Sequence, residues 1–354
     1  LGVLLLSTAT TCLIFFTDFG GDAAHGWKAP ETWMWGAGLL IAALLFVFVE
    51  SRAADPIIPL SFFRNPVFVN ATAIGLMIGL AMFAAIGFIP TFLQMASGTS
   101  AAVSGLLMLP MMVGLMGTSI ASGLIITRTG RYKVFPIAGT LTTGLAIVLM
   151  AGMTAETPIW IICVFLFIFG AGLGLIMQVV VLVVQNAVPA ADIGSATSTN
   201  NYFREVGAAL GTAVFGTLFT TRLSENLTSV FADAGATPEQ AAEATATIDP
   251  QVLDQLPATV RDGIVTAYAD ALAPVFWYVL PFIGVAFVLS LFLKQVPLSD
   301  VAGLVARGEA VGGEEAERLE AEQRASADAR TPRAARAADP GDASNAPGRD
   351  RRER

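Results

Sequence analysis

Residues Pro158–Val184 read PIWIICVFLFIFGAGLGLIMQVVVLVV, a run of 27 residues that contains no charged side chain. A helix of about 20 apolar residues is long enough to cross the hydrocarbon core of a membrane, which is about 30 Å thick. The run is too long for a barrel strand, and it lacks the alternation of apolar and polar residues that such a strand requires. It therefore predicts a transmembrane helix.

Seven more runs of this kind flank that stretch. They are Leu1–Thr17, Trp33–Val49, Val67–Met95, Ala102–Ile126, Val134–Met153, Ser195–Thr221 and Ala273–Leu293. Hydrophobic residues make up 55% of the chain and charged residues 14%, whereas about 25% charged residues is typical of soluble domains. The sequence therefore predicts an all-α polytopic membrane protein with eight transmembrane helices.

The charged residues and the few reactive side chains limit the possible functions. Of 20 basic and 28 acidic residues, 22 lie between residues 300 and 354, so the eight runs are nearly free of charge. The net charge of −8 argues against nucleic-acid binding, which requires a basic surface. Two cysteines inside apolar runs, Cys12 and Cys163, and the one histidine, His25, indicate neither a metal site nor a catalytic group. We therefore expect no enzyme activity and no bound cofactor.

Basic residues between the runs predict the orientation, because cytoplasmic loops are enriched in Lys and Arg. Seven lie on one side and three on the other, namely Arg52, Arg64, Arg128, Arg131, Lys133, Arg204 and Lys294 against Lys28, Arg222 and Arg261. The richer side, which also carries the tail, is predicted to be cytoplasmic. We expect a plasma-membrane protein whose first helix runs outward and whose carboxyl terminus is cytoplasmic.

Two long segments lie outside the predicted membrane helices. Residues 223–272 form an extracytoplasmic segment that we expect to be a surface loop, with a packed cap as the alternative. Its last part, residues 258–272, places apolar side chains on one helical face. Residues 299–354 are rich in Ala, Arg and Glu, and we expect a disordered cytoplasmic tail after a short helix around residues 314–327.

The most distinctive polar segment is the loop Gly123-Leu-Ile-Ile-Thr-Arg-Thr-Gly-Arg-Tyr-Lys133 between two apolar runs. Gly130 can adopt the positive φ that a tight turn requires. Arg128, Arg131 and Lys133 can contact helix ends or lipid phosphates. Taken alone, the three positive charges are equally well explained as an anchor that keeps this loop on the cytoplasmic side.

The pattern Gly-x4-Arg-x-Gly-Arg-x-Lys in this loop resembles the second-half loop signature of the major facilitator superfamily. Four more stretches resemble the fourteen-span drug/proton antiporters of that superfamily, the EmrB/QacA type. They are Pro59–Asn65 (PLSFFRN), Phe88–Gln94 (FIPTFLQ), Gly105–Pro110 (GLLMLP) and Gly194–Gly207 (GSATSTNNYFREVG). The resemblance covers about residues 1–298.

This resemblance implies a partial major facilitator fold that carries the last eight of fourteen spans. Residues 1–50 would be two linker helices, residues 51–66 a cytoplasmic connection and residues 67–298 the carboxyl-terminal six-helix bundle. Since Leu1 starts within an apolar run, we expect the amino-terminal half of the same chain to be missing and this piece alone not to transport. The implied energy source is the proton gradient.

One position departs from the family signature. Thr127 stands where the first-half signature has an Asp before its Arg, so the charge relay attributed to that Asp has no counterpart here. We expect Arg128 and Arg131 to brace the cytoplasmic gate instead.

Proton coupling needs a carboxylate within the membrane. None is predicted deep in these spans, so the coupling acids are expected in the missing half. Arg204 lies within the inner third of the membrane if its helix begins near Ser195, or anchors a loop if the helix begins near Arg204 itself. Glu205 is adjacent on the helix and is not expected to pair with it.

Substrate contacts are expected from helices that face the cavity between the two halves. Those helices carry uncharged polar or soft side chains at Gln94, Gln178, Gln185, Phe88, Met111 and Met177. Met and Phe adapt to varied apolar ligands, although packing in the core or against lipid is the simpler interpretation for any single one. Gln178 and Gln185 are better candidates, because residues seven apart lie on one helix face.

Small residues recur at four-residue spacing in three of the runs. The pairs are Gly75 and Gly79, Gly170 and Gly174, and Gly207 and Gly211. This spacing predicts close helix packing and is compatible with two inverted three-helix repeats. A role as hinges is the alternative.

These observations predict a proton-coupled exporter of amphipathic drugs, whose partners are the lipid bilayer and a small-molecule substrate. Export of an endogenous metabolite or lipid on the same fold is the nearest alternative, and a membrane sensor or enzyme is a remote one. Neither the substrate nor the oligomeric state is predicted.

Overall fold

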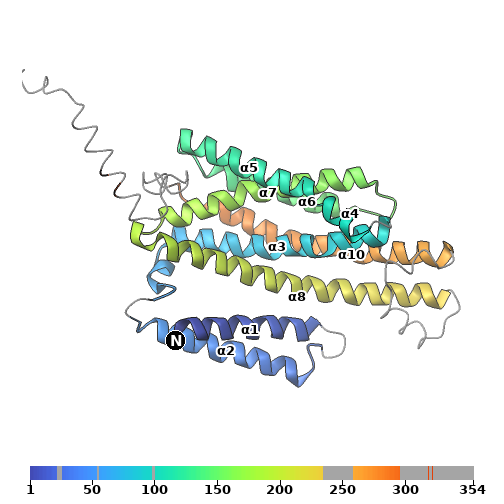
Figure 1. The fold of residues 1–354 in the computed structure, drawn as a ribbon, viewed down its shortest axis with the longest axis horizontal. Coiled ribbons are helices and arrows are strands. Elements are labelled where there is room, and N and C mark those ends of the chain that lie inside the picture. The colour runs from blue at the N-terminus through green and yellow to red at the C-terminus, as the bar shows by residue number, and fades with distance from the viewer. Residues whose placement is uncertain are drawn as a thin grey trace, which may run out of the picture.

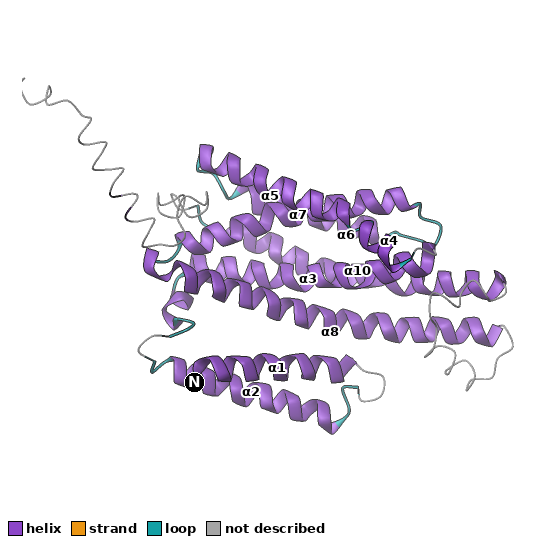
Figure 2. Ribbon diagram, in the orientation of Figure 1, coloured by secondary structure: helices purple, strands orange, loops and turns teal. Residues whose placement is uncertain are grey.

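The computed structural model describes residues 1–21, 26–53, 56–97, 100–233 and 258–295, together with the isolated positions 318 and 321. All regular elements in these ranges are helical (Figure 2). They are α1 Gly2–Gly21, α2 Pro30–Glu50, η1 Leu60–Arg64, α3 Pro66–Ser97, α4 Ala101–Leu106, α5 Leu109–Thr129, α6 Val134–Ala151, α7 Ile159–Asn186, η2 Ala190–Asp192, α8 Ile193–Asp233 and α10 Ala258–Phe292.

The described helices supply eight candidate membrane spans, with α4 and α5 together forming one of them. This confirms the eight helices predicted from the sequence. Their axes run roughly side by side (Figure 1). Helices α3, α5, α6, α7, α8 and α10 pack into one bundle, and the hairpin of α1 and α2 lies beside it, with α1 in contact with α8.

Proline and glycine mark the ends of several helices. Pro30 and Pro66 occupy the first turns of α2 and α3, where a missing N–H costs no hydrogen bond. At the start of α4, the Ser100 Oγ accepts a hydrogen bond from the Val103 N–H at 3.3 Å. Gly130 ends α5 with a φ of 67°, the left-handed conformation that glycine adopts without steric cost. The positive φ predicted for Gly130 is therefore confirmed.

The bundle has an apolar core and an apolar outer surface. Ile74, Ile147, Phe169 and Phe276 from four different helices are completely buried in one hydrophobic cluster. Large apolar side chains are also exposed along the helices, among them Leu44, Ile120, Val134, Trp160 and Phe292. Such a surface is costly in water and suited to contact with lipid.

The connection between α2 and α3 is held by side-chain hydrogen bonds. The Ile58 N–H donates to the buried carboxylate of Glu50 at 2.6 Å, and the Ser195 Oγ donates to the Ile57 carbonyl at 2.9 Å. The Asn65 amide donates to the Ala187 carbonyl at 2.8 Å. These bonds fix the α1–α2 hairpin to the same end of the bundle as the start of α8.

Residues 223–233 and 258–272, the described parts of the outer segment, differ from the surface loop that we expected from the sequence. Helix α8 continues to Asp233, and α10 already begins at Ala258. The two extensions pack together, since Leu227 and Ile264 are buried and the Asn226 amide donates to the Ala267 carbonyl at 3.2 Å. The apolar face predicted for residues 258–272 is the reason, because it is covered by α8 instead of solvent.

Several predictions concern residues outside the described ranges. They are His25, the middle of the outer segment at 234–257, the helix expected around residues 314–327 and almost all of the tail.

Candidate functional site on α3, α5, α7 and α8

Helices α5 and α7 touch through their backbones at three glycines, Gly114 of α5 and Gly170 and Gly174 of α7. A Cβ added to Gly170 would overlap the backbone of Met111, and one added to Gly174 would overlap the Leu115 carbonyl and the Thr118 hydroxyl. The Thr118 Oγ1 also donates to the Ala171 carbonyl of α7 at 2.8 Å. Only glycine allows an approach this close.

Helices α3 and α8 repeat this arrangement. A Cβ added to Gly207 would overlap the Leu76 carbonyl, and one added to Gly211 would overlap the Leu80 carbonyl. On the other helix, Gly79 lies against the Arg204 carbonyl, and a Cβ added to Gly75 would stand 3.0 Å from the Asn200 Oδ1. All six glycines singled out in the sequence therefore lie at helix contacts.

The α5–α7 and α3–α8 contacts occupy equivalent positions in the bundle. If α3, α5 and α6 form one three-helix set and α7, α8 and α10 the other, each contact joins the first helix of one set to the second helix of the other. This exchange is what inverted repeats produce. In both contacts, two glycines four residues apart face two carbonyls four residues apart on the partner helix.

A third set of glycine contacts joins α6 and α7 and escaped the sequence interpretation. A Cβ on Gly139 would stand 2.6 Å from an Ile176 side-chain carbon, and one on Gly172 would stand 2.6 Å from the Thr143 backbone nitrogen. Gly139 has no glycine at four-residue spacing in α6, so the pattern alone did not indicate it.

The two glutamines of α7 lie between the paired helices. The Ser119 Oγ of α5 donates to the Gln178 Oε1 at a long 3.4 Å, and the Gln185 Nε2 donates to the Thr197 Oγ1 of α8 at 3.2 Å. Both side chains are partly buried. This face of α7 thus carries two amides with hydrogen-bonding capacity left over and no charge.

The other substrate candidates occupy different environments. Met111 is 1% exposed within the α5–α7 contact, so it serves the core, the alternative already favoured for a single Met. Phe88 packs on Phe219 with ring centroids 5.0 Å apart. The Gln94 amide donates to the Pro90 carbonyl of its own helix at 3.2 Å, and Met177 is partly buried. Met111 therefore offers no free group to a solute, whereas the Gln94 amide keeps its second N–H and its oxygen.

Arg204 lies inside a membrane helix. Because α8 begins at Ile193, Arg204 stands eleven residues into it, about 16 Å along the axis. Its Nη2 forms an ion pair with the Glu205 Oε1 at 3.2 Å, with side chains 20% and 57% exposed. The expectation that adjacent residues would not pair is therefore wrong, because the long Arg side chain can fold back along the helix.

Several buried polar atoms without a hydrogen-bond partner lie on α3 and α8. Within the described residues they include the Arg204 Nε, the Asn200 Oδ1 on α8, and the Asn70 Oδ1 and Thr72 Oγ1 on α3. An unpaired polar group in an apolar interior is costly. The Asn200 and Asn70 amides are polar residues inside apolar runs, a signal that the sequence interpretation did not use.

The loop Gly123–Lys133 lies at the end of the bundle that also carries the start of α8. Arg128 and Arg131 are exposed, Lys133 is partly buried, and Gly123 lies on α5 about 4.0 Å from the Gln178 side chain when a Cβ is added. The bases therefore face outward from the protein, as an anchor or an external brace requires.

The same loop holds the end of α10. Tyr132, which is 1% exposed, donates its hydroxyl to the Lys294 carbonyl at 2.7 Å. The Gln295 amide donates to the Gly130 carbonyl at 3.2 Å. No sequence pattern indicates this contact, because it joins segments that lie 162 residues apart.

An apolar bundle of membrane helices with an uncharged polar face and two glycine-packed helix pairs is typical of a membrane transport protein. The sequence model of the Major Facilitator Superfamily matches residues 3–212. The chain belongs to this superfamily.

The curated relatives include two proteins named as transporters and one named as a resistance determinant. An MFS-type transporter of Mycobacterium tuberculosis is 41% identical over 309 residues, which is 85% of this chain and 43% of the relative. The multidrug transporter protein MdtP of Bacillus subtilis is 30% identical over 320 residues, 84% of this chain and 59% of the relative. A tetracycline resistance determinant of Streptomyces rimosus is 33% identical over 203 residues, 54% of this chain and 58% of the relative. The chain thus spans about half the length of these relatives.

A solved structure shares the fold. The crystal structure of a bacterial homolog to the human lysosomal transporter Spinster, inward-facing and occupied, superposes with a TM-score of 0.50 at 17% identity. The match covers 81% of this chain and 64% of that structure. It supports the helical architecture described above.

Proposed function

We propose that this chain forms the carboxyl-terminal part of a fourteen-span exporter that moves amphipathic small molecules out of the cell in exchange for protons. The proposal makes α1 and α2 the linker pair and the remaining spans one of two bundles that rock against each other. The share of its relatives that the chain covers, about half of their length, supports this.

The observation that carries the proposal is the face of α7 between α5 and α8. Gln178 and Gln185 lie there with unused hydrogen-bonding capacity, and glycine contacts fix the flanking helices. A few amides in an apolar setting orient a ligand without demanding a charge. Such a face suits varied lipophilic solutes, and the multidrug name of one relative agrees with it.

Proton coupling is the less direct part of the proposal. Among the described spans, Glu205 of α8 and Asp270 of α10 are the acids farthest from a helix end. Glu205 is paired with Arg204, and Asp270 is exposed in the extension of α10 that precedes the apolar run Ala273–Leu293. We therefore place the coupling acids in the half of the protein that this chain does not contain. The distribution of basic residues supports a cytoplasmic carboxyl terminus, and export out of the cell implies the plasma membrane.

Efflux from cells that produce the whole protein tests the proposal. Cells lacking their main drug pumps should lose a fluorescent lipophilic cation faster when the protein is present, and a protonophore should abolish the difference. Efflux that ignores the protonophore contradicts proton coupling, and no efflux of any of a panel of amphipathic dyes contradicts drug export.

A pair of variants tests the α7 face itself. Gln178→Leu should lower the efflux rate about tenfold, the effect of one lost hydrogen bond to a solute of about 1.4 kcal/mol. Gln295→Leu is the matched control, because Gln295 is exposed beyond the end of the last membrane span, away from the α7 face. Equal rates for both variants at equal membrane expression would show that the face does not contact the solute.

A further inference from the structure

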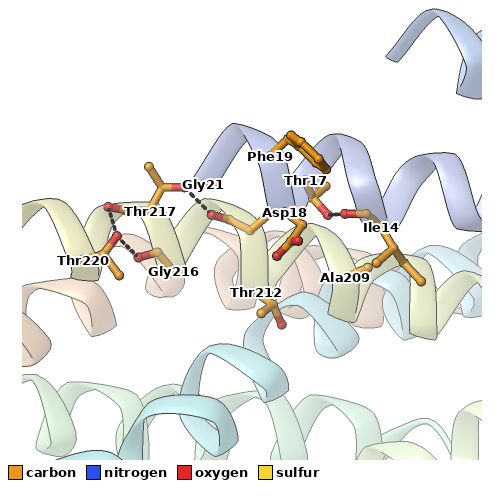
Figure 3. Close-up of a pocket in the computed structure, with 11 residues that line it drawn as sticks. Ile14, Thr17, Asp18, Phe19, Gly21, Ala209, Thr212, Gly216, Thr217 and Thr220 are labelled. Carbon is orange, nitrogen blue, oxygen red and sulfur yellow. Dashed lines mark hydrogen bonds between the residues drawn. The ribbon is translucent and has the colours of Figure 1, made fainter. Parts of the chain in front are cut away.

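A cavity of about 610 Å³ lies between α1 and α8, outside the six-helix bundle (Figure 3). It is lined by Ile14, Thr17, Asp18, Phe19 and Gly21 of α1 and by Ala209, Thr212, Ala213, Gly216, Thr217 and Thr220 of α8. Cavities of 300–1,000 Å³ with mainly apolar walls and a few polar groups are typical ligand sites.

The cavity lies on the side of α8 that faces away from the bundle. At 100° per residue, Gly207 and Gly211 point toward α3, whereas Ala209, Gly216 and Thr220 project from the opposite side. A ligand in this cavity therefore does not touch the face formed by α3, α5, α7 and α8. The site is independent of the function proposed above.

The hydroxyl groups of the lining can only accept hydrogen bonds from a ligand. Each threonine proton is already donated to a carbonyl of its own helix, and only the oxygen lone pairs remain. These bonds run from Thr17 to Ile14 at 2.8 Å, from Thr212 to Ala208 at 3.0 Å, from Thr217 to Ala213 at 2.8 Å and from Thr220 to Gly216 at 3.0 Å.

Asp18 adds a negative charge to these acceptors. Figure 3 shows its side chain between the two helices, on the side of α1 that faces α8. No basic residue belongs to the described lining. The next cation along α8, Arg222, donates to the Tyr278 hydroxyl at 3.0 Å and packs on that ring. The cavity thus favours a cation that donates hydrogen bonds.

The depth of Asp18 matches that of a lipid headgroup. Helix α1 has 20 residues, about 30 Å of rise, which is the thickness of the hydrocarbon core. Asp18 lies three residues before its end, about 5 Å inside one membrane boundary. Ile14, one turn deeper, and Ala209 supply apolar walls at the level of acyl chains.

We propose that this cavity binds the ammonium group of an amphipathic amine, with its alkyl chain lying along the crevice between α1 and α8. Asp18 neutralises the ammonium charge, and the threonine oxygens accept its N–H bonds. The amine belongs either to the headgroup of an aminolipid or to a single-chain alkylamine from solution.

Binding of dodecylammonium to the whole chain in nanodiscs of phosphatidylglycerol tests the chemistry. Asp18→Asn should raise the dissociation constant for dodecylammonium about tenfold. Glu156→Gln is the matched control, because Glu156 is an exposed acid in the turn between α6 and α7. Equal affinities of wild type and Asp18→Asn would overturn the proposal.

A second variant guards against a folding defect. Thr212→Val removes one acceptor while Asp18 stays in place, and it should weaken dodecylammonium binding severalfold with unchanged helical content. If both variants keep the wild-type affinity, the cavity does not hold the amine.

Native mass spectrometry distinguishes the two sources. The wild-type chain taken from mixed membranes should retain phosphatidylethanolamine over phosphatidylglycerol if the occupant is an aminolipid, and Asp18→Asn should lose that preference. Dodecylammonium binding without lipid preference assigns the site to single-chain amines. The site is refuted if the chain shows no lipid preference and does not bind dodecylammonium.

Discussion

Replacing Gly170 by Ala tests whether the glycine contacts hold the bundle together. The added Cβ would overlap the backbone of Met111, and a backbone cannot rotate away as a side chain can. Helices α5 and α7 must therefore move apart, which weakens the packing along their whole contact.

The expected size of the effect follows from two opposing terms. Forcing an extra carbon into a packed interior costs about 1–3 kcal/mol, and a clash with backbone atoms belongs in the upper part of that range. Replacing Gly by Ala within a helix returns about 1 kcal/mol. The net loss for Gly170→Ala is about 1–2 kcal/mol of unfolding free energy.

Gly117→Ala is the matched control on the same helix pair. Gly117 lies on α5, and a Cβ there meets no atom within 4 Å, so only the gain in helix propensity remains. Reversible unfolding of the purified chain in mixed detergent micelles, followed by circular dichroism, should place the two variants about 2–3 kcal/mol apart. If Gly170→Ala is as stable as Gly117→Ala, the close glycine contacts do not stabilise the bundle.

Two further changes probe the ends of the bundle. Tyr132→Phe removes the hydrogen bond to the Lys294 carbonyl and should cost about 1–2 kcal/mol in the same unfolding assay; hydrogen exchange at the end of α10 should rise, and unchanged exchange would contradict the contact. Ile264→Ala removes a fully buried side chain and should lower the unfolding free energy by about 2–5 kcal/mol, more than the neighbouring Val265→Ala does. A loss near zero would support the surface loop expected from the sequence.

The membrane helices could be predicted because their signal is local. A long uncharged run such as Pro158–Val184 predicts a membrane helix without reference to distant residues, and the structure places α7 at Ile159–Asn186. Glycine spacing was similarly informative, since Gly207 and Gly211 meet two carbonyls of α3. In lipid, close packing must replace the hydrophobic effect between helices, so small residues carry the information.

What could not be predicted depends on partners that are distant in sequence. Residues 258–272 have an apolar face, but the sequence does not say whether lipid or other helices cover it. The structure buries Ile264 and places Tyr268 beside Phe219 of α8. Tyr132 likewise finds its acceptor on α10. The pairing of Arg204 with Glu205 was missed for another reason, because side-chain length decided it and residue spacing did not.

Helix α8 connects the two sites proposed for this chain, and its packing determines which side can yield. Its inner side is fixed on α3 through Gly207 and Gly211, where backbone meets backbone. Its outer side meets α1 across the cavity that contains Asp18. An amine that wedges into this cavity should therefore displace the α1–α2 hairpin and leave the bundle unchanged. Toward its other end, the hairpin is joined to α8 by the Ser195 hydroxyl, which donates to the Ile57 carbonyl, and by the Thr10 hydroxyl, which donates to the Tyr202 hydroxyl. We expect the hairpin to pivot about these two contacts.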